Sequence, residues 1–473
     1  MNDKTNKKIL WVLFLGVLMG ALDIAIVAPA LPSIQNYFGA GDRILAWTFT
    51  IYVLFNLIGT PLMAKLSDRY GRRSIYIIDV MLFTAGSLVV ALSSNNAFSQ
   101  LLAGRALQGF GAGGIFPVAS AVIGDIFPPE KRGRALGLIG AVFGLAFIIG
   151  PILGGVILSF ATWQWLFIIN IPIALVVIMM GWKILPANGS DTGKKFDWPG
   201  LLALGVLLAS LAFSINQIDT QHFFSSLLSL NVFPFFLLGL ILLIVFPRIE
   251  KKAADPIVNM NLFQGRQTKL ASLLSAGAGL GESGMAYIPA LAVASIPGVI
   301  NTHNSSYMLM PVVLAMSIGS PLVGRLMDKV GSKVMVFSGT LLLAVGMLLL
   351  STSQFSARLW GFILAAVIIG FGLSSLLGAP MRYIMLNEAS AADRTSAQGL
   401  ISLFTSVGQL ASSALIGGVA ASAGGGVSGY SAAYRVIAIV AVIMILLSLG
   451  LKNRQLELTT RQDHQSTSAT NGS

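Results

Sequence analysis

The sequence predicts an all-α polytopic membrane protein with about fourteen membrane-spanning helices and both termini in the cytoplasm. The prediction depends on the composition, on the spacing of the apolar runs and on an internal repeat. Of the 473 residues, 55% are apolar and only 10% are charged, whereas a soluble domain has about 25% charged residues. No long stretch of the chain supplies the hydrophilic surface that several soluble domains would need. The composition therefore excludes a soluble multidomain protein.

The charge and the cysteine content exclude further classes. The net charge is +12, but the basic residues form short clusters between apolar runs and no basic domain, so we expect no nucleic-acid partner. The chain has no cysteine, which excludes disulfides, thiolate metal sites and a cysteine nucleophile. The apolar run from Ile9 is too long for a signal peptide. We therefore expect the bilayer to be the surroundings of most of the chain.

Apolar runs of about 20 residues, the length that spans a bilayer core as a helix, recur along the whole chain. They begin near Ile9, Ala46, Ser74, Phe98, Gly133, Trp163, Trp198, Leu230, Lys269, Ser306, Lys333, Leu359, Ser396 and Ala432. An even number of spans with a cytoplasmic N-terminus places nearly all loop Lys and Arg residues inside, leaving Arg43, Arg358 and Arg435 outside. This asymmetry is the positive-inside pattern of membrane proteins.

An internal repeat divides the chain. Residues 66–73 recur at 326–333, an offset of 260, and three further pairs follow at offsets of 261 to 263. These pairs are Gly109 with Gly370, Arg132 with Arg394, and Pro117 with Pro380. The offset gives two parallel six-helix bundles. Their predicted bounds are 1–185 and 269–451, with linkers and an inserted helix pair in 186–268 and a disordered cytoplasmic tail in 452–473.

Four local motifs resemble those of the major facilitator superfamily, and within it the fourteen-helix drug:proton antiporters. They are the cytoplasmic loop with Asp68, Arg69, Gly71, Arg72 and Arg73 and its second copy with Asp328, Gly331 and Lys333; the Arg105 motif; the first-span motif with Asp23; and the fifth-span antiporter motif with Gly140, Gly144, Gly150, Pro151, Gly154 and Gly155. The resemblance implies the major facilitator fold, proton coupling at Arg105, export through the antiporter motif, and an inner gate latched by the loop cluster.

Three ionisable residues lie within predicted spans, where insertion costs roughly 2.5 to 3.5 kcal/mol each. Asp23 lies about 21 Å from the inner end of its span and Arg105 about 10 Å from the outer end of its own, at about 1.5 Å per residue. In a core about 30 Å thick the two depths coincide. We expect Arg105 to hold the Asp23 carboxylate ionised in one state and to release it in another, which would make Asp23 a proton carrier. The alternative is a permanent ion pair that only fixes helix register.

Glu282 matches Asp23 under the repeat, at an offset of 259. The two could face one another across a central cavity and bind protons, a cationic substrate, or both in competition. The alternative for Glu282 is a protonated carboxyl that is hydrogen-bonded to a neighbouring helix. Asp79 is expected nearer the inner end of its span, where it would complete the cytoplasmic charge cluster.

The loop cluster and the glycines also have simpler explanations. The loop arginines could serve only as anchors to anionic lipid, and the fifth-span glycines could serve only for close helix packing. The glycines and Pro151 also predict a local kink.

No Walker-type phosphate loop is present, so we expect a secondary transporter, not an enzyme, that is driven by the proton gradient and has no cofactor or metal. The leading hypothesis is a monomeric exporter of amphipathic or cationic small molecules by alternating access, in a bacterial cell membrane. The alternative is a major facilitator carrier for a specific metabolite, a nutrient, or a lipid or lysolipid. An enzyme would need a catalytic constellation, and the only histidines are His222, His303 and His464, in predicted loops or the tail.

Overall fold

The computed structural model describes residues 3–127, 129–186, 196–302, 304–389 and 394–459. All regular secondary structure in these ranges is helical. The helices are α1 (Asp3–Phe38), α2 (Asp42–Leu45), α3 (Trp47–Tyr70), α4 (Arg72–Ala91), α5 (Phe98–Ile126), α6 (Pro129–Phe160), α7 (Trp165–Ile168), α8 (Asn170–Ile184), α9 (Trp198–Gln217), α10 (Phe223–Leu227) and α11 (Phe233–Glu250). They continue with η1 (Met260–Gln264), α12 (Arg266–Met285), α13 (Ile288–Ser295), η2 (Ser305–Leu309), α14 (Met310–Val330), α15 (Ser332–Leu350), α16 (Ser353–Ser356), α17 (Leu359–Leu377), α18 (Ala379–Glu388), α19 (Arg394–Ser422) and α20 (Gly426–Leu449).

Twelve of the described helical segments are long and apolar enough to cross a membrane. The all-α polytopic architecture is thereby confirmed, whereas the predicted number of about fourteen spans is not supported. The two predicted positions missing from the twelve are those of α6 and α12. The described apolar part of α6 that meets the composition criterion covers only Gly144–Phe160, and α12 is rich in Gly, Ser and charged residues at its start. The described part of α6 is therefore apolar but too short to be counted, whereas α12 is long enough but not apolar enough.

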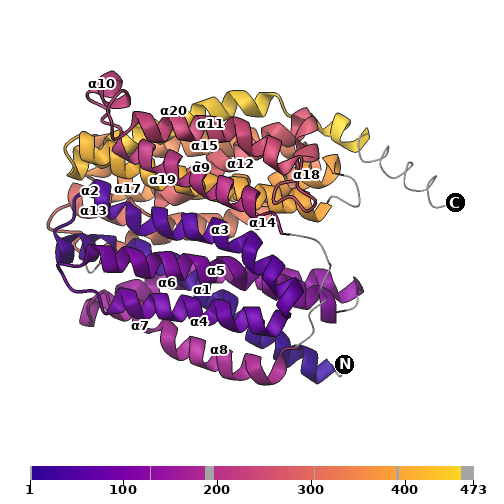
Figure 1. The fold of residues 1–473 in the computed structure, drawn as a ribbon. Coiled ribbons are helices and arrows are strands. Elements are labelled where there is room, and N and C mark those ends of the chain that lie inside the picture. Colours follow the sequence, from indigo (N-terminus) through magenta and orange to yellow (C-terminus); the bar gives the residue numbers. More distant parts are fainter. Residues whose placement is uncertain (1–2, 128, 187–195, 303, 390–393, 460–473) are drawn as a thin grey trace. The chain divides into compact units, whose positions relative to one another are not determined.

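The chain divides into two compact units. The first unit comprises Met1–Ser214, Leu230–Ile257 and Ile300–Tyr307. The second comprises Ile215–Ser229, Val258–Val299 and Met308–Ser473. In the first unit α5 packs between α3 and α4, and α1 packs on α6; Figure 1 shows α3, α5 and α4 lying side by side. In the second unit α17 packs on α14 and α15, and α12 packs on α19.

Equivalent contacts recur inside the two units at the offset found in the sequence. Gly71 and Gly331 have positive φ angles of 95° and 88°, and each ends one helix and begins the next. Only glycine adopts this conformation without strain, so both copies need it for the sharp turn. A Cβ at Gly109 would overlap the Tyr52 carbonyl oxygen, and a Cβ at the equivalent Gly370 would overlap that of Val312. Backbones of neighbouring helices therefore touch at the same place in each unit.

The end of the second unit departs from prediction. The segment after Lys452 was expected to be disordered, but residues 454–459 are helical and the Glu457 side chain is buried. The remainder of the predicted tail lies outside the described residues.

Candidate functional site

Asp23 in α1 and Arg105 in α5, which depth counting places at the same level, are in contact. Arg105 Nη1 donates a hydrogen bond to Asp23 Oδ2, with an N···O distance of 2.6 Å. The exposed fractions of the two side chains are 1% for Asp23 and 0% for Arg105. A charge-assisted hydrogen bond of this length in a dry interior is strong, but each ion is costly to bury without the other.

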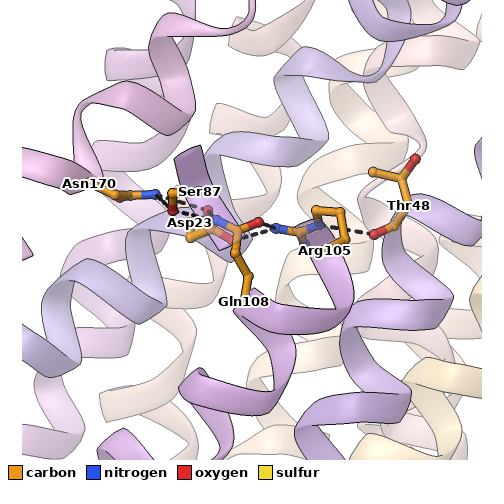
Figure 2. A network of polar contacts seen from close by, with 6 residues as sticks. All are labelled: Asp23, Thr48, Ser87, Arg105, Gln108 and Asn170. Atoms are coloured by element: carbon orange, nitrogen blue, oxygen red, sulfur yellow. Dashed lines mark hydrogen bonds and ion pairs between the residues drawn. The ribbon is translucent and has the colours of Figure 1, made fainter. Parts of the chain in front are cut away.

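Two neutral amides complete the network around Asp23. Gln108, one turn after Arg105 on α5, accepts from Arg105 Nη1 (2.9 Å) and donates to Asp23 Oδ1 (2.9 Å) and Ser87 Oγ (2.7 Å). Asn170, the first residue of α8, donates to Asp23 Oδ1 at 3.1 Å. Figure 2 shows the chain of contacts from Asn170 through Asp23 to Arg105. The Asp23 carboxylate thus accepts hydrogen bonds from side chains on two other helices and can hold a full negative charge there.

The far side of Arg105 faces α3. Its Nε donates to the Thr48 carbonyl oxygen at 3.1 Å, and its guanidinium carbon lies 4.2 Å from the centre of the Tyr52 ring. Its Nη2 is buried and has no hydrogen-bond acceptor among the described residues. The α3 carbonyl and ring therefore hold the guanidinium on the side away from Asp23.

Glu282 lies in α12 of the second unit, and its side chain is half-buried. The Gln409 amide in α19 donates to Glu282 Oε2 at 2.9 Å, and no ion pair with Glu282 occurs in the described part of the chain. The residue that aligns with Arg105 in the second unit is Ala366, at an offset of 261. The two predicted acidic positions therefore differ: Asp23 is held by a cation and Glu282 by a neutral amide.

The cytoplasmic loop of the first unit forms a charge cluster. Arg72 pairs with Asp68 in the same loop and with Asp125 at the end of α5 (3.0 Å). Arg73 donates to the Trp182 carbonyl oxygen (3.3 Å) and lies over the Trp182 ring, and Arg69 lies over the ring of the adjacent tyrosine. The cluster therefore ties the loop to α5 and α8.

The second copy of the loop is tied differently. Asp328 is exposed and forms no ion pair within the described residues. Instead Glu457 from the C-terminal segment accepts from the Ser332 backbone N–H (3.3 Å) and from the Ser332 hydroxyl, at the N-terminus of α15. Lys333 donates to the Leu449 carbonyl oxygen at 2.6 Å. A carboxylate supplied from outside the loop thus caps this helix.

The fifth-span glycines fall into two groups. A Cβ at Gly150 would overlap Ala25, and one at Gly154 would lie 3.0 Å from Pro29, so these glycines let α6 pack directly on α1. A Cβ at Gly155 would lie 2.7 Å from Ser306 Oγ. A Cβ at Gly144 would meet no atom of the described residues within 4 Å, which differs from the close packing expected there. Pro151 lies within α6, and the surroundings of Gly140 are not among those described.

Asp79 does not join the cytoplasmic cluster, contrary to the prediction. It lies in the eighth position of α4, its side chain is completely buried, and neither carboxyl oxygen has a hydrogen-bond partner among the described residues. Counting residues from the basic loop placed it near the membrane surface, but it did not reveal that the side chain points at α5.

Sequence reasoning also missed the roles of Gln108 and Asn170. Gln108 could have been found, because a residue three positions after Arg105 lies on the same face of the helix. Asn170 is the first residue of α8, shortly after the short helix α7, and nothing in its flanking sequence singles it out.

The sequence profile of the Major Facilitator Superfamily matches residues 13–299 and 271–471. An uncharacterized MFS-type transporter, YfiU of Bacillus subtilis, is 33% identical over 416 residues, which is 86% of this chain and 78% of the relative. Multidrug resistance protein 3 of the same organism is 30% identical over 80% of this chain and 74% of the relative. The riboflavin transporter RibZ of Clostridioides difficile is 28% identical over 78% of each chain.

Solved structures are similar in fold. A peptide transporter, POT, in complex with sulfate aligns with a TM-score of 0.70 at 14% identity, covering 94% of each chain. A bacterial homologue of the human lysosomal transporter Spinster aligns with a TM-score of 0.67 at 15% identity, covering 98% of this chain and 99% of the other.

Proposed function

Because the chain belongs to the Major Facilitator Superfamily, and is thus a multi-pass membrane transporter and not an enzyme, we propose that it exports amphipathic or cationic small molecules in exchange for protons. Relatives at about 30% identity that are named multidrug resistance proteins support this cargo. The proposed setting is a bacterial cell membrane, because the relatives come from Bacillus and Mycobacterium. We further propose that the protein acts as a monomer, without cofactor or nucleic acid.

The observation that carries the proposal is the buried network around Asp23. An ionised Asp23 satisfies Arg105, Gln108 and Asn170 together. When a proton adds to Asp23 from the outside, the carboxyl becomes neutral and Arg105 loses its counter-ion in a buried position. A buried cation without its partner is costly, so protonation favours a second conformation. Transfer of the proton to the inside restores the pair, and alternating access completes the cycle.

Glu282 is the proposed second acidic position. Its carboxyl accepts one hydrogen bond from a neutral amide and is half-buried, so it can accept either a proton or a cationic substrate. A cationic substrate that binds there would displace a proton. This competition for one carboxyl couples substrate binding to proton release without a direct contact between substrate and proton.

We also propose that the chain is of the fourteen-helix drug:proton antiporter type, with α6 and α12 as further spans. α6 is a 32-residue helix that packs along α1, and α12 is a 20-residue helix that packs along α19. The cytoplasmic cluster around Arg72 would act as the latch of the inner gate, and the glycines of α6 would provide the α1 contact that changes during export.

Proton release from everted membrane vesicles, energised acid inside, tests the proposal. Lipophilic cations such as ethidium are added to vesicles that contain wild-type protein, Asp23→Asn, Glu282→Gln or Arg105→Ala. Substrate-dependent proton release is expected in wild type, with a loss of at least tenfold in Asp23→Asn and Arg105→Ala. The matched control is Asp219→Asn: Asp219 lies outside the spans, where the Gln221 backbone N–H lowers the pKa of its carboxyl, and the variant should behave as wild type.

Wild-type protein that moves ethidium without moving protons would contradict coupling. A response that survives in Asp23→Asn would remove Asp23 from the coupling step. No response to any cation would favour a second candidate, a carrier for a specific metabolite. The riboflavin transporter among the relatives supports that candidate, and uptake or release of labelled riboflavin by the same vesicles tests it.

A further inference from the structure

Asp79 is a buried carboxyl that the Asp23 network does not use. It lies in α4 of the first unit, its exposed fraction is 0%, and both of its oxygens lack a hydrogen-bond partner among the described residues. No ion pair of Asp79 occurs in the described ranges either. A lone charged carboxylate in such surroundings is very costly, whereas a neutral carboxylic acid is tolerated.

The charged groups on the helices that pack against α4 are engaged elsewhere or lie near helix ends. On α4 itself, Arg72 and Arg73 contact Asp68, Asp125 and Trp182, and the Tyr76 hydroxyl, one turn from Asp79, donates to the Leu13 carbonyl oxygen. On α5, Arg105 pairs with Asp23 and Asp125 pairs with Arg72. The only titratable group of α8 is Lys183, in its last turn. The titratable groups of α3 are Lys65, Asp68, Arg69, Tyr52 and Tyr70. The described α7 has none. None of these residues forms an ion pair with Asp79.

The sequence of α5 makes room for this carboxyl. A Cβ at Gly114 would overlap all three atoms of the Asp79 carboxyl group, and a Cβ at Gly111 would lie 2.5 Å from the Asp79 carbonyl oxygen. The two glycines therefore bring the α5 backbone directly onto α4 at Asp79. A larger residue at either position would push the helices apart.

The second unit makes the same crossing without an acid. Asp79 aligns with Gly339 and Gly114 with Ser375, at offsets of 260 and 261. There, a Cβ at Gly339 would lie 2.6 Å from Ser375 Cβ and 3.0 Å from the Gly372 carbonyl oxygen. In the first unit the larger residue lies on α4 and the glycine on α5. In the second unit the glycine lies on α15, which matches α4, and the larger residue, Ser375, lies on α17. The helix crossing itself therefore does not require a carboxyl, and its presence in the first unit needs another explanation.

We propose that Asp79 is a second proton-binding site of the first unit, separate from the Asp23 pair. In the conformation described here its carboxyl carries a proton, and the α4–α5 crossing at Gly111 and Gly114 keeps water away. When the crossing loosens, water reaches the carboxyl, the O–H bond breaks, the proton leaves on water and a hydrated carboxylate remains. Closure requires a proton to return. That Asp79 binds a proton does not depend on the proposed function. That this proton takes part in transport rests on the proton-coupled export proposed above.

Infrared spectroscopy of purified protein in lipid tests the binding step without any substrate. Wild type at pH 7 should show the C=O stretch of a protonated carboxylic acid that is missing in Asp79→Asn and retained in Asp219→Asn. A second variant combines Asp79→Gly with Gly114→Ser, which copies the crossing of the second unit. It should fold, export and lack the band. If neither Asp79 variant loses a band, Asp79 is ionised and the proposal is overturned.

Counting protons tests the transport step. In the vesicle assay the two Asp79 variants should release one proton fewer per exported substrate than wild type, with Asp23 intact. An unchanged ratio would overturn the role of Asp79 in coupling even if the infrared band is lost. If wild type releases no protons at all, proton-coupled export fails, but the infrared result still decides whether Asp79 binds a proton.

Discussion

Gln108 joins more of the buried network than any other neutral side chain described in the first unit. Its carbonyl oxygen accepts from Arg105, and its amide nitrogen donates to both Asp23 and Ser87. It lies on the same face of α5 as Arg105. Gln108 therefore fixes where the guanidinium and the carboxylate meet, which a bare ion pair would leave to two flexible side chains.

Replacement of Gln108 by Leu should lower the free energy of unfolding by about 1–3 kcal/mol, since buried polar groups lose their partner. The change should appear as a lower midpoint of thermal unfolding in detergent. Gln100→Leu is the matched control, because Gln100 lies on the same helix and makes one peripheral hydrogen bond, to the Val89 carbonyl oxygen at 3.3 Å. Equal losses in the two variants would show that the network adds nothing.

At the scale of helices, glycines decide which pairs touch. The glycines of α6 have two kinds of surroundings. Gly150 lies against Ala25 of α1, whereas a Cβ at Gly144 would have no described atom within 4 Å. The C-terminal segment 452–459 works in another way: Glu457 in its short helix caps α15, and Lys452 before that helix pairs with Glu388 at 2.5 Å. The glycine contact fixes which faces of α1 and α6 meet, and the Glu457 cap fixes the N-terminal end of α15. Each uses very few side-chain atoms.

Gly150→Ala should separate α1 from α6 and lower the free energy of unfolding by about 1–3 kcal/mol through overpacking. Gly144→Ala is the control: with space available, the added methyl should be neutral or should stabilise the helix by up to about 1 kcal/mol. Thermal unfolding of both variants measures the difference. Two variants of equal stability would contradict the α1–α6 contact.

At the scale of the whole molecule, the proposed fourteen spans require α6 and α12 to cross the membrane in addition to the twelve apolar segments. Both are long helices, but only α12 is less apolar than most of the others, whereas the described apolar part of α6, Gly144–Phe160, is shorter than the other segments or about as long as the shortest. A helix packed among other helices can carry small and polar residues where it does not face lipid, which weakens the hydropathy signal.

Single cysteines decide the number of spans, because the chain has no cysteine of its own. If α6 crosses together with α5, cysteines at Asn95 and Thr162 should react with an impermeant maleimide from the same side of the membrane. If α12 crosses, cysteines at Asn259 and Val299 should react from opposite sides. Cysteines at Asn95 and Thr162 that react from opposite sides would exclude α6 as a span.

Several features could be predicted from the sequence because they depend on fixed geometry. The rise of a helix placed Asp23 and Arg105 at one depth, and the glycine pairs of the repeat located the equivalent turns at Gly71 and Gly331. Twelve of the predicted spans also have a matching helical segment.

Other features depend on which face a side chain occupies and on contacts between distant segments. Asn170 reaches Asp23 across 147 positions of sequence, and Glu457 reaches Ser332 across 125. Neither contact leaves a local pattern. The depth of Asp79 along α4 could be counted, but its direction could not, and for this reason it was wrongly assigned to the cytoplasmic cluster.

The close approach of Gly109 to the Tyr52 carbonyl, and of Gly370 to that of Val312, leaves no room for a side chain and limits how the helices can move. If α5 slid along α3 by one residue, Gln108 or Phe110 would meet the carbonyl in place of glycine, and neither fits. Small sliding steps are thus blocked at this crossing, as at the equivalent one between α14 and α17. Each of these helix pairs should therefore move as one rigid body. Conformational change within either unit must then occur at other helix contacts.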